Sequence, residues 1–137
     1  MKNLEAKIAG IVNITTDSFS DGGRYLQTDK AIEHAMQLVQ DGADFIDLGA
    51  ASSNINTSPV SVEVEIERLK PVIKELKKQN VFISVDTFKP DVQRFCLEQG
   101  VNYINDIQGF PFPEIYSELA KSNCHLILMH SVQRLGP

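Results

Sequence analysis

Residues 81–90 read VFISVDTFKP, and this stretch contains the repeating unit of the predicted fold. It begins with Val81–Val85, a short continuous apolar run of the kind found in strands that are buried on both faces. Asp86 follows directly, and Pro90 opens a segment of helical period that stops at Gly100. A buried strand that ends on a carboxylate and leads into a helix predicts one β/α unit.

The same unit recurs along the chain. Similar apolar runs occupy Ile8–Ile14, Phe45–Leu48, Tyr103–Ile107 and Leu126–Met129. Helical periods occupy Asp29–Gln40, Ser61–Lys78 and a segment that opens at Pro113, with Ile115, Tyr116 and Leu119 directed inward. Pro71 should kink or interrupt the second of these. Strict alternation predicts an α/β fold with a parallel sheet. The 137 residues suit a doubly wound sheet, or part of a (β/α)₈ barrel of about 250 residues.

Composition excludes several classes of function. With 42% hydrophobic and 23% charged residues, the chain is typical of a soluble globular domain. The net charge of -5 argues against nucleic acid as a partner. Neither a signal peptide nor a membrane-spanning segment is expected, which predicts a cytoplasmic protein. Cys96 and Cys124 lie in apolar stretches and are interpreted as reduced core thiols.

Polar residues gather at the carboxyl ends of the predicted strands. They are Asn13, Asp47, Asp86, Asn105 with Asp106, and His130. Ligands of parallel α/β folds bind at this end, where the loops converge, so these residues predict one site. Each also has a structural interpretation: Asn13 can bond its own turn, and Asp47 can tie its strand to a neighbouring loop. Dinucleotide, P-loop and zinc patterns are missing from the sequence.

Four blocks of sequence together resemble the dihydropteroate synthases. Residues 10–23, GIVNITTDSFSDGG, resemble the first motif of that family over fourteen positions. Residues 84–90, 104–107 and 128–130 resemble its motifs at the third, fourth and fifth strands, in the same order. Any one block alone is unspecific, but together they span the whole chain.

The resemblance implies the amino-terminal portion of a TIM-type (β/α)₈ barrel, with about five strands. Residues 1–137 would form a single pterin-binding domain, an incomplete barrel truncated after the fifth strand. The implied reaction joins p-aminobenzoate to a dihydropterin pyrophosphate, giving dihydropteroate and pyrophosphate with Mg²⁺ as cofactor. A homodimer is expected for a full-length form, through later helices. The fragment alone is expected to be inactive.

The resemblance also implies roles for individual residues. Asp86 and Asn105 would hold the polar edge of the pterin, and Asn13 would bind the magnesium pyrophosphate; these three are the implied catalytic residues. The segment from Asp17 to Gly23, which includes Ser18, would be a mobile loop over the pyrophosphate. Phe19 would line the aminobenzoate site, and Met129 would pack under the pterin.

The loop after the second strand departs from the family pattern. Ser53 stands where a threonine is usual and Asn54 where an arginine is usual, so contacts of this loop with pyrophosphate and aminobenzoate are expected to differ. Together with residues 106–111, this resembles the sulfonamide-resistant branch carried on mobile elements. The alternative interpretation is a non-catalytic pterin- or folate-binding fragment of a methyltransferase-type barrel, whose first loop does not normally read like residues 17–23.

Overall fold

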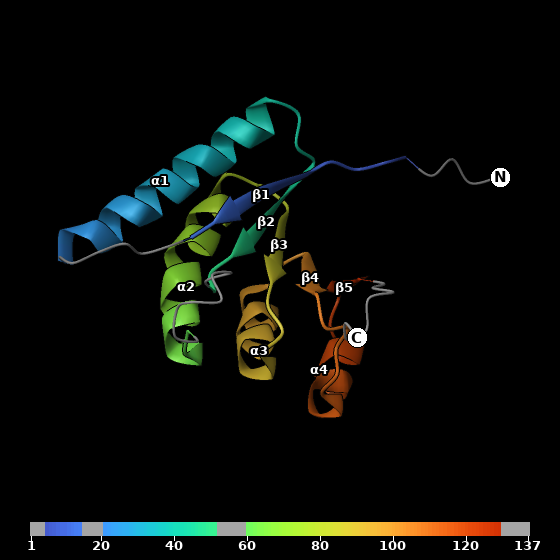
Figure 1. Ribbon diagram of the computed structural model, residues 1–137. Helices are drawn as coiled ribbons and strands as arrows, with labels where there is room; N and C mark the ends of the chain where they lie inside the picture. Colours follow the sequence, from blue (N-terminus) through green and yellow to red (C-terminus); the bar gives the residue numbers. More distant parts are fainter. Residues whose placement is uncertain (1–4, 15–20, 52–59, 130–137) are drawn as a thin grey trace, which may run out of the picture.

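The computed structural model describes residues 5–14, 21–51 and 60–129. Strands and helices alternate along these residues, as the sequence predicts (Figure 1). The strands are β1 (Ala9–Asn13), β2 (Phe45–Gly49), β3 (Ile83–Asp86), β4 (Tyr103–Asp106) and β5 (His125–Leu128). The helices are α1 (Asp21–Gln40), α2 (Val62–Lys78), α3 (Pro90–Gln99) and α4 (Tyr116–Lys121), the last preceded by a 3₁₀ turn, η1 (Pro113–Ile115).

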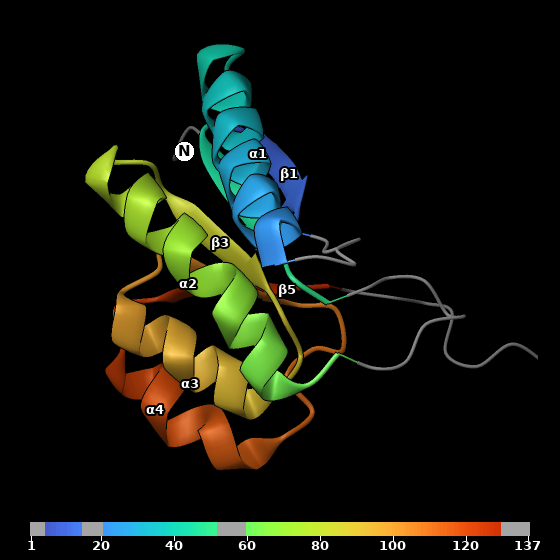
Figure 2. The same ribbon diagram turned by 90° about the vertical axis from the view of Figure 1, so that its left-hand side faces the viewer.

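The five strands form one parallel sheet in the order β1-β2-β3-β4-β5. Each strand therefore pairs with the next strand along the chain, and β1 and β5 are the two edges of the sheet. All the helices lie on the same side of the sheet (Figures 1 and 2). This sequential one-sided winding is the geometry of a (β/α)₈ barrel, because a doubly wound sheet carries helices on both faces.

The core lies between the helices and the sheet. Alternate strand residues point into it, among them Val12, Leu48, Val85 and Ile104, all 0–1% exposed. Gly10 allows α1 to lie close to β1, since a Cβ there would meet the Leu38 side chain at 3.1 Å. The opposite, helix-free face of the sheet is called the open face below.

Three helical details differ from the sequence prediction. Helix α1 begins at Asp21 rather than Asp29, so residues 21–23 of the expected loop belong to its first turn. Pro71 does not interrupt α2, which continues from Val62 to Lys78 with Pro71 on its exposed side and the neighbouring Val72 and Ile73 buried. Tyr116 was expected to point inward, but it is 48% exposed.

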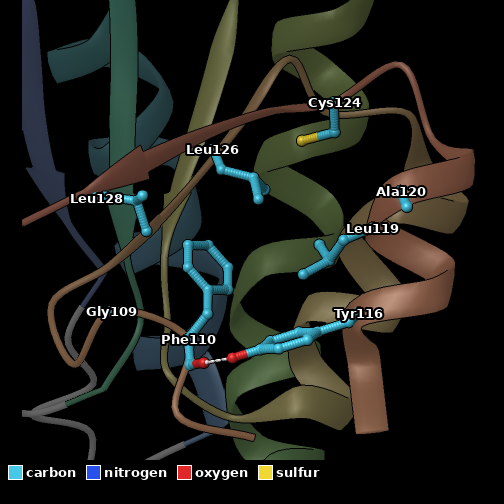
Figure 3. Close-up of a pocket in the computed structure, with 8 residues that line it drawn as sticks. All are labelled: Gly109, Phe110, Tyr116, Leu119, Ala120, Cys124, Leu126 and Leu128. Atoms are coloured by element: carbon cyan, nitrogen blue, oxygen red, sulfur yellow. Dashed lines mark hydrogen bonds between the residues drawn. The ribbon is translucent and has the colours of Figure 1, made fainter. Parts of the chain in front are cut away.

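An apolar groove lies on the helix side of β5 (Figure 3). It has a volume of about 390 Å³ and is lined by Phe110, Tyr116, Leu119, Cys124, Leu126 and Leu128, with Gly109 and Ala120. The Tyr116 hydroxyl donates a hydrogen bond of 2.6 Å to the Phe110 carbonyl at one end of the groove. Leu128 is 66% exposed there. Within the described residues, no helix is long and apolar enough to cross a membrane.

Candidate functional site

The predicted site residues of β1, β3 and β4 lie in one row across the sheet. The strand register pairs Asn13 with Gly49, Gly49 with Asp86, and Asp86 with Asn105. Because paired strands lie about 4.8 Å apart, Asp86 and Asn105 are immediate neighbours, and Asn13 lies two strands from Asp86. The row ends at Ile127 on β5. All its side-chain positions face the open side, alternating with core residues.

Gly49 provides the room that the Asn13 side chain occupies. A Cβ at position 49 would meet the Asn13 side-chain oxygen at 3.1 Å, closer than an ordinary van der Waals contact. The Asn13 amide therefore leans over β2, into the gap between β1 and Asp86. A glycine in the middle of the row thus leaves space for the Asn13 side chain on the side of Asp86.

The carboxyl group of Asp86 lies in a strongly acidic environment. It is half-buried, and burial followed by the charge of Asp47 raises its pKa to about 6. The charges of Asp106 and Glu65 contribute smaller parts of the same rise, in that order. Asp86 therefore titrates near pH 6 in the free protein, and hydrogen-bond donors of a ligand would stabilise its ionised form.

Asp47 lies on the same open face as Asp86, two residues nearer the amino ends of the strands. Its register partner is Ser84, whose hydroxyl donates a buried hydrogen bond of 2.6 Å to the Asp47 carboxylate. This bond crosses from β2 to β3. Asp47 thus has a structural contact, but with the neighbouring strand rather than with the loop that the sequence interpretation named, and its charge also acts on Asp86.

Asn105 and Asp106 are adjacent in sequence but point to opposite faces of β4. Asn105 faces the open side beside Asp86, and its carbonyl accepts a hydrogen bond of 3.1 Å from the Thr87 backbone amide. Asp106 is 1% exposed and faces the helices, where the Gln93 side chain donates to it at 3.0 Å and the Gln108 backbone amide at 2.8 Å. Only the first member of the Asn-Asp pair is therefore available to a ligand.

An ion pair supports the turn that follows Asp86. Lys89 and Glu65 approach to 2.7 Å, with only 20% and 2% of their side chains exposed. Lys89 also donates to the Val60 carbonyl, and Arg68 donates to the Ala50 carbonyl at 2.8 Å. These contacts attach α2 and the start of α3 to the carboxyl ends of the strands.

Sequence reasoning missed two residues of this supporting layer, Glu65 and Gln93. Both are 1% exposed. The sequence did offer one indication of their role, because a polar residue on the apolar stripe of a helix is buried and needs a hydrogen-bonding partner. Neither residue was assigned a role in the site from the sequence.

The remaining predicted site residues lie outside the row, and only Met129 is among the described residues. Met129 follows β5 directly and is 54% exposed. Asp17, Ser18, Phe19, Ser53, Asn54 and His130 lie outside the described residues. Among the residues that are described, no group of three or more His, Cys, Asp or Glu side chains is arranged to hold a metal ion.

Comparison with known proteins gives one consistent family. The family model described as "Pterin binding enzyme" matches residues 9–136. The chain is 74% identical over 131 residues to dihydropteroate synthase type-3 of Escherichia coli, a match that covers 96% of this chain and 50% of that protein. The chain therefore spans about half the length of this curated relative.

Solved structures of dihydropteroate synthases share the fold. That of Anaplasma phagocytophilum with bound 6-hydroxymethylpterin-monophosphate superimposes with a TM-score of 0.81 at 41% identity, covering 90% of this chain and 48% of that one. That of Xanthomonas albilineans with 4-aminobenzoic acid gives 0.79 at 38% identity, covering 94% and 48%. The described sheet is thus the amino-terminal half of a dihydropteroate synthase barrel, and the chain belongs to the family of pterin-binding enzymes.

Proposed function

We propose that this chain is the pterin-binding half of a dihydropteroate synthase, which joins p-aminobenzoate to a dihydropterin pyrophosphate and releases pyrophosphate. The observation that carries the proposal is the row of Asn13, Asp86 and Asn105 on the open face. Similar proteins bind a hydroxymethylpterin phosphate and 4-aminobenzoic acid, which supports the choice of these two substrates. Residues 1–137 would then be one domain, an incomplete barrel.

Asp86 and Asn105 would bind the polar edge of the pterin. An amide offers both a donor and an acceptor, and a carboxylate offers two acceptor oxygens, so the neighbouring pair can match an edge that carries both kinds of group. Positive charge that develops on the pterin as pyrophosphate departs would also be stabilised by the nearby carboxylates. Met129, beyond the end of β5, would pack under the ring.

Asn13 would hold the pyrophosphate end through Mg²⁺. The fit is sound for this metal, because Mg²⁺ keeps several waters, takes its remaining ligands from substrate phosphates and needs few from the protein. The single amide oxygen of Asn13, held over Gly49, suits that role. When bound, the metal would neutralise the charge of the departing pyrophosphate. Asp17 and Ser18 would contact the same group.

Phe19, Ser53 and Asn54 would belong to the aminobenzoate side of the site. Since Asn54 carries no charge where the family pattern has an arginine, this side is proposed to distinguish p-aminobenzoate from sulfonamides that mimic it. The complete enzyme would be a sulfonamide-insensitive homodimer, assembled through helices beyond residue 137. Turnover by an extended chain in the presence of sulfonamide tests this point, and strong inhibition would contradict it.

Isothermal titration of chain 1–137 with 6-hydroxymethylpterin monophosphate and Mg²⁺ tests the function. We expect binding that Asp86→Ala abolishes and that Asp44→Ala, an exposed carboxylate at the opposite end of β2, leaves unchanged. A folded chain that does not bind would contradict the proposed half-site. Tighter binding of a methyl-folate than of the pterin phosphate would favour the methyltransferase-type alternative.

A further inference from the structure

Gln93 links the carboxyl ends of the two strands that carry Asp86 and Asn105. It lies in the first turn of α3, and its side chain is buried at 1% exposure. Its amide nitrogen donates to the Thr87 carbonyl at 2.9 Å and to the Asp106 carboxylate at 3.0 Å. A carboxamide nitrogen has two hydrogens, so both are used.

The two acceptors are the residues that directly follow the proposed pterin ligands. Thr87 follows Asp86 at the end of β3, and Asp106 follows Asn105 at the end of β4. The Thr87 amide completes the link from the other side by donating to the Asn105 carbonyl at 3.1 Å. In addition to the pairing of β3 with β4, a closed ring of hydrogen bonds through one helix side chain therefore joins the strand ends beside Asp86 and Asn105.

We propose that Gln93 is a positioning residue for pterin recognition, which acts by fixing Asp86 and Asn105 in register from the helix side of the sheet. The proposal rests on the function proposed above. Gln93 touches no ligand, because it faces the core and the ligand row faces the open side. Its effect would pass through Thr87 and Asp106.

Three side chains similar to glutamine cannot make the same link. Glutamate keeps the length of glutamine but loses both donors, and it would place a carboxylate against the Asp106 carboxylate. Methionine keeps the approximate volume but leaves the Thr87 carbonyl without its side-chain donor, and asparagine is one methylene too short to reach both strands. Gln93 is thus required for its two donors together with its length.

Binding of 6-hydroxymethylpterin monophosphate to variants of chain 1–137 tests the proposal. We expect Gln93→Met to weaken binding about tenfold, the effect of roughly one well-placed hydrogen bond. Gln108→Met is the matched control, since Gln108 is exposed and meets Asp106 through its backbone amide. Hydrogen exchange of the Thr87 amide should accelerate in Gln93→Met and stay unchanged in Gln108→Met, while exchange in β1 and β2 stays unchanged in both.

A double variant that exchanges the amide and carboxylate groups of residues 93 and 106 distinguishes a positioning role from a general effect on stability. Gln93→Glu should weaken binding more than Gln93→Met, and adding Asp106→Asn should recover most of that difference, because the new amide can donate to the new carboxylate. If wild type binds the pterin and folded Gln93→Met binds equally well, the positioning role is wrong and the proposed function stands. If folded wild type does not bind, the proposed function itself fails.

Discussion

The negative charge of Asp86 lowers the stability of the folded chain but would favour the proposed ligand binding. Half-burial and three neighbouring carboxyl groups make its negative charge unfavourable in the free protein and raise its pKa to about 6. A bound pterin that donates hydrogen bonds would stabilise the same charge. The acidic surroundings of Asp86 therefore reduce stability in the free chain and would strengthen its interaction with a ligand that carries or develops positive charge.

The pH dependence of stability should reveal this unfavourable charge. Since the pKa of Asp86 rises on folding from 3.8 to about 6, the folded state binds the proton more tightly than the unfolded state. Ionised Asp86 thus lowers stability progressively as pH rises through this window, and the full loss remains above it. Asp86→Asn should raise the melting temperature clearly at about pH 7.5 and much less at about pH 4.5.

Melting temperatures of wild type and Asp86→Asn across this pH range check the prediction. Asp91→Asn is the control, because Asp91 is exposed at the start of α3 and pairs with Arg94 at 2.7 Å. It should give no gain that grows between about pH 4.5 and 7.5. An Asp86→Asn gain that is the same at both pH values would show that the carboxyl group is not titrating near 6.

Helix α2 illustrates how a local cap positions part of the site. Ser61 has an extended backbone, and its hydroxyl accepts a hydrogen bond of 3.2 Å from the Val64 amide, which caps the first turn. Glu65, the partner of Lys89, lies in that turn. Ser61→Ala should lower the free energy of unfolding by about 1 kcal/mol, as measured by urea denaturation.

The matched control for this cap is Ser117→Ala, an exposed serine inside α4. Alanine is the better helix former at such a position, so the free energy of unfolding should change by less than about 0.5 kcal/mol. Equal losses in both variants would mean that the Ser61 hydroxyl contributes nothing as a cap.

Periodicity predicted the elements well where apolar residues determine the structure. The runs at β2 and β3 were identified within two residues because apolar residues predominate in both, although Asp47 and Ser84 interrupt them. The start of α1 was placed too late, at Asp29, because Gly22 and Gly23 suggest a turn and no apolar stripe continues through them. Pro71 was given too much weight, since its position on the exposed side of α2 allows the helix to continue around it.

The candidate site was predictable only in part. The polar residues at strand ends indicated one edge of the sheet, and the structure brings Asn13, Asp86 and Asn105 into one row there. The sequence could not indicate that one glutamine side chain spans two strand ends, because this depends on how α3 packs on β3 and β4. Long-range geometry of that kind leaves no local pattern.

The whole molecule has a sheet covered by helices on one face only (Figures 1 and 2). Parallel sheets are normally covered on both faces or closed into a barrel. Here Ile11 on β1 and Phe82 just before β3 are both more than half exposed. Leu128 on the edge strand β5 is exposed as well. Exposed apolar side chains beside an unpaired strand edge favour self-association.

Leu128→Ser should therefore reduce self-association of chain 1–137 without unfolding it. The Leu128 side chain borders the apolar groove beside β5 and is 66% exposed, so its loss removes surface apolarity and little packing (Figure 3). Sedimentation velocity over a range of concentrations should show a shift towards monomer. Leu119→Ser is the control, because Leu119 lines the same groove but is 6% exposed, and its loss should lower the melting temperature. An unchanged sedimentation profile for a folded Leu128→Ser variant would contradict the idea that this groove and edge mediate association.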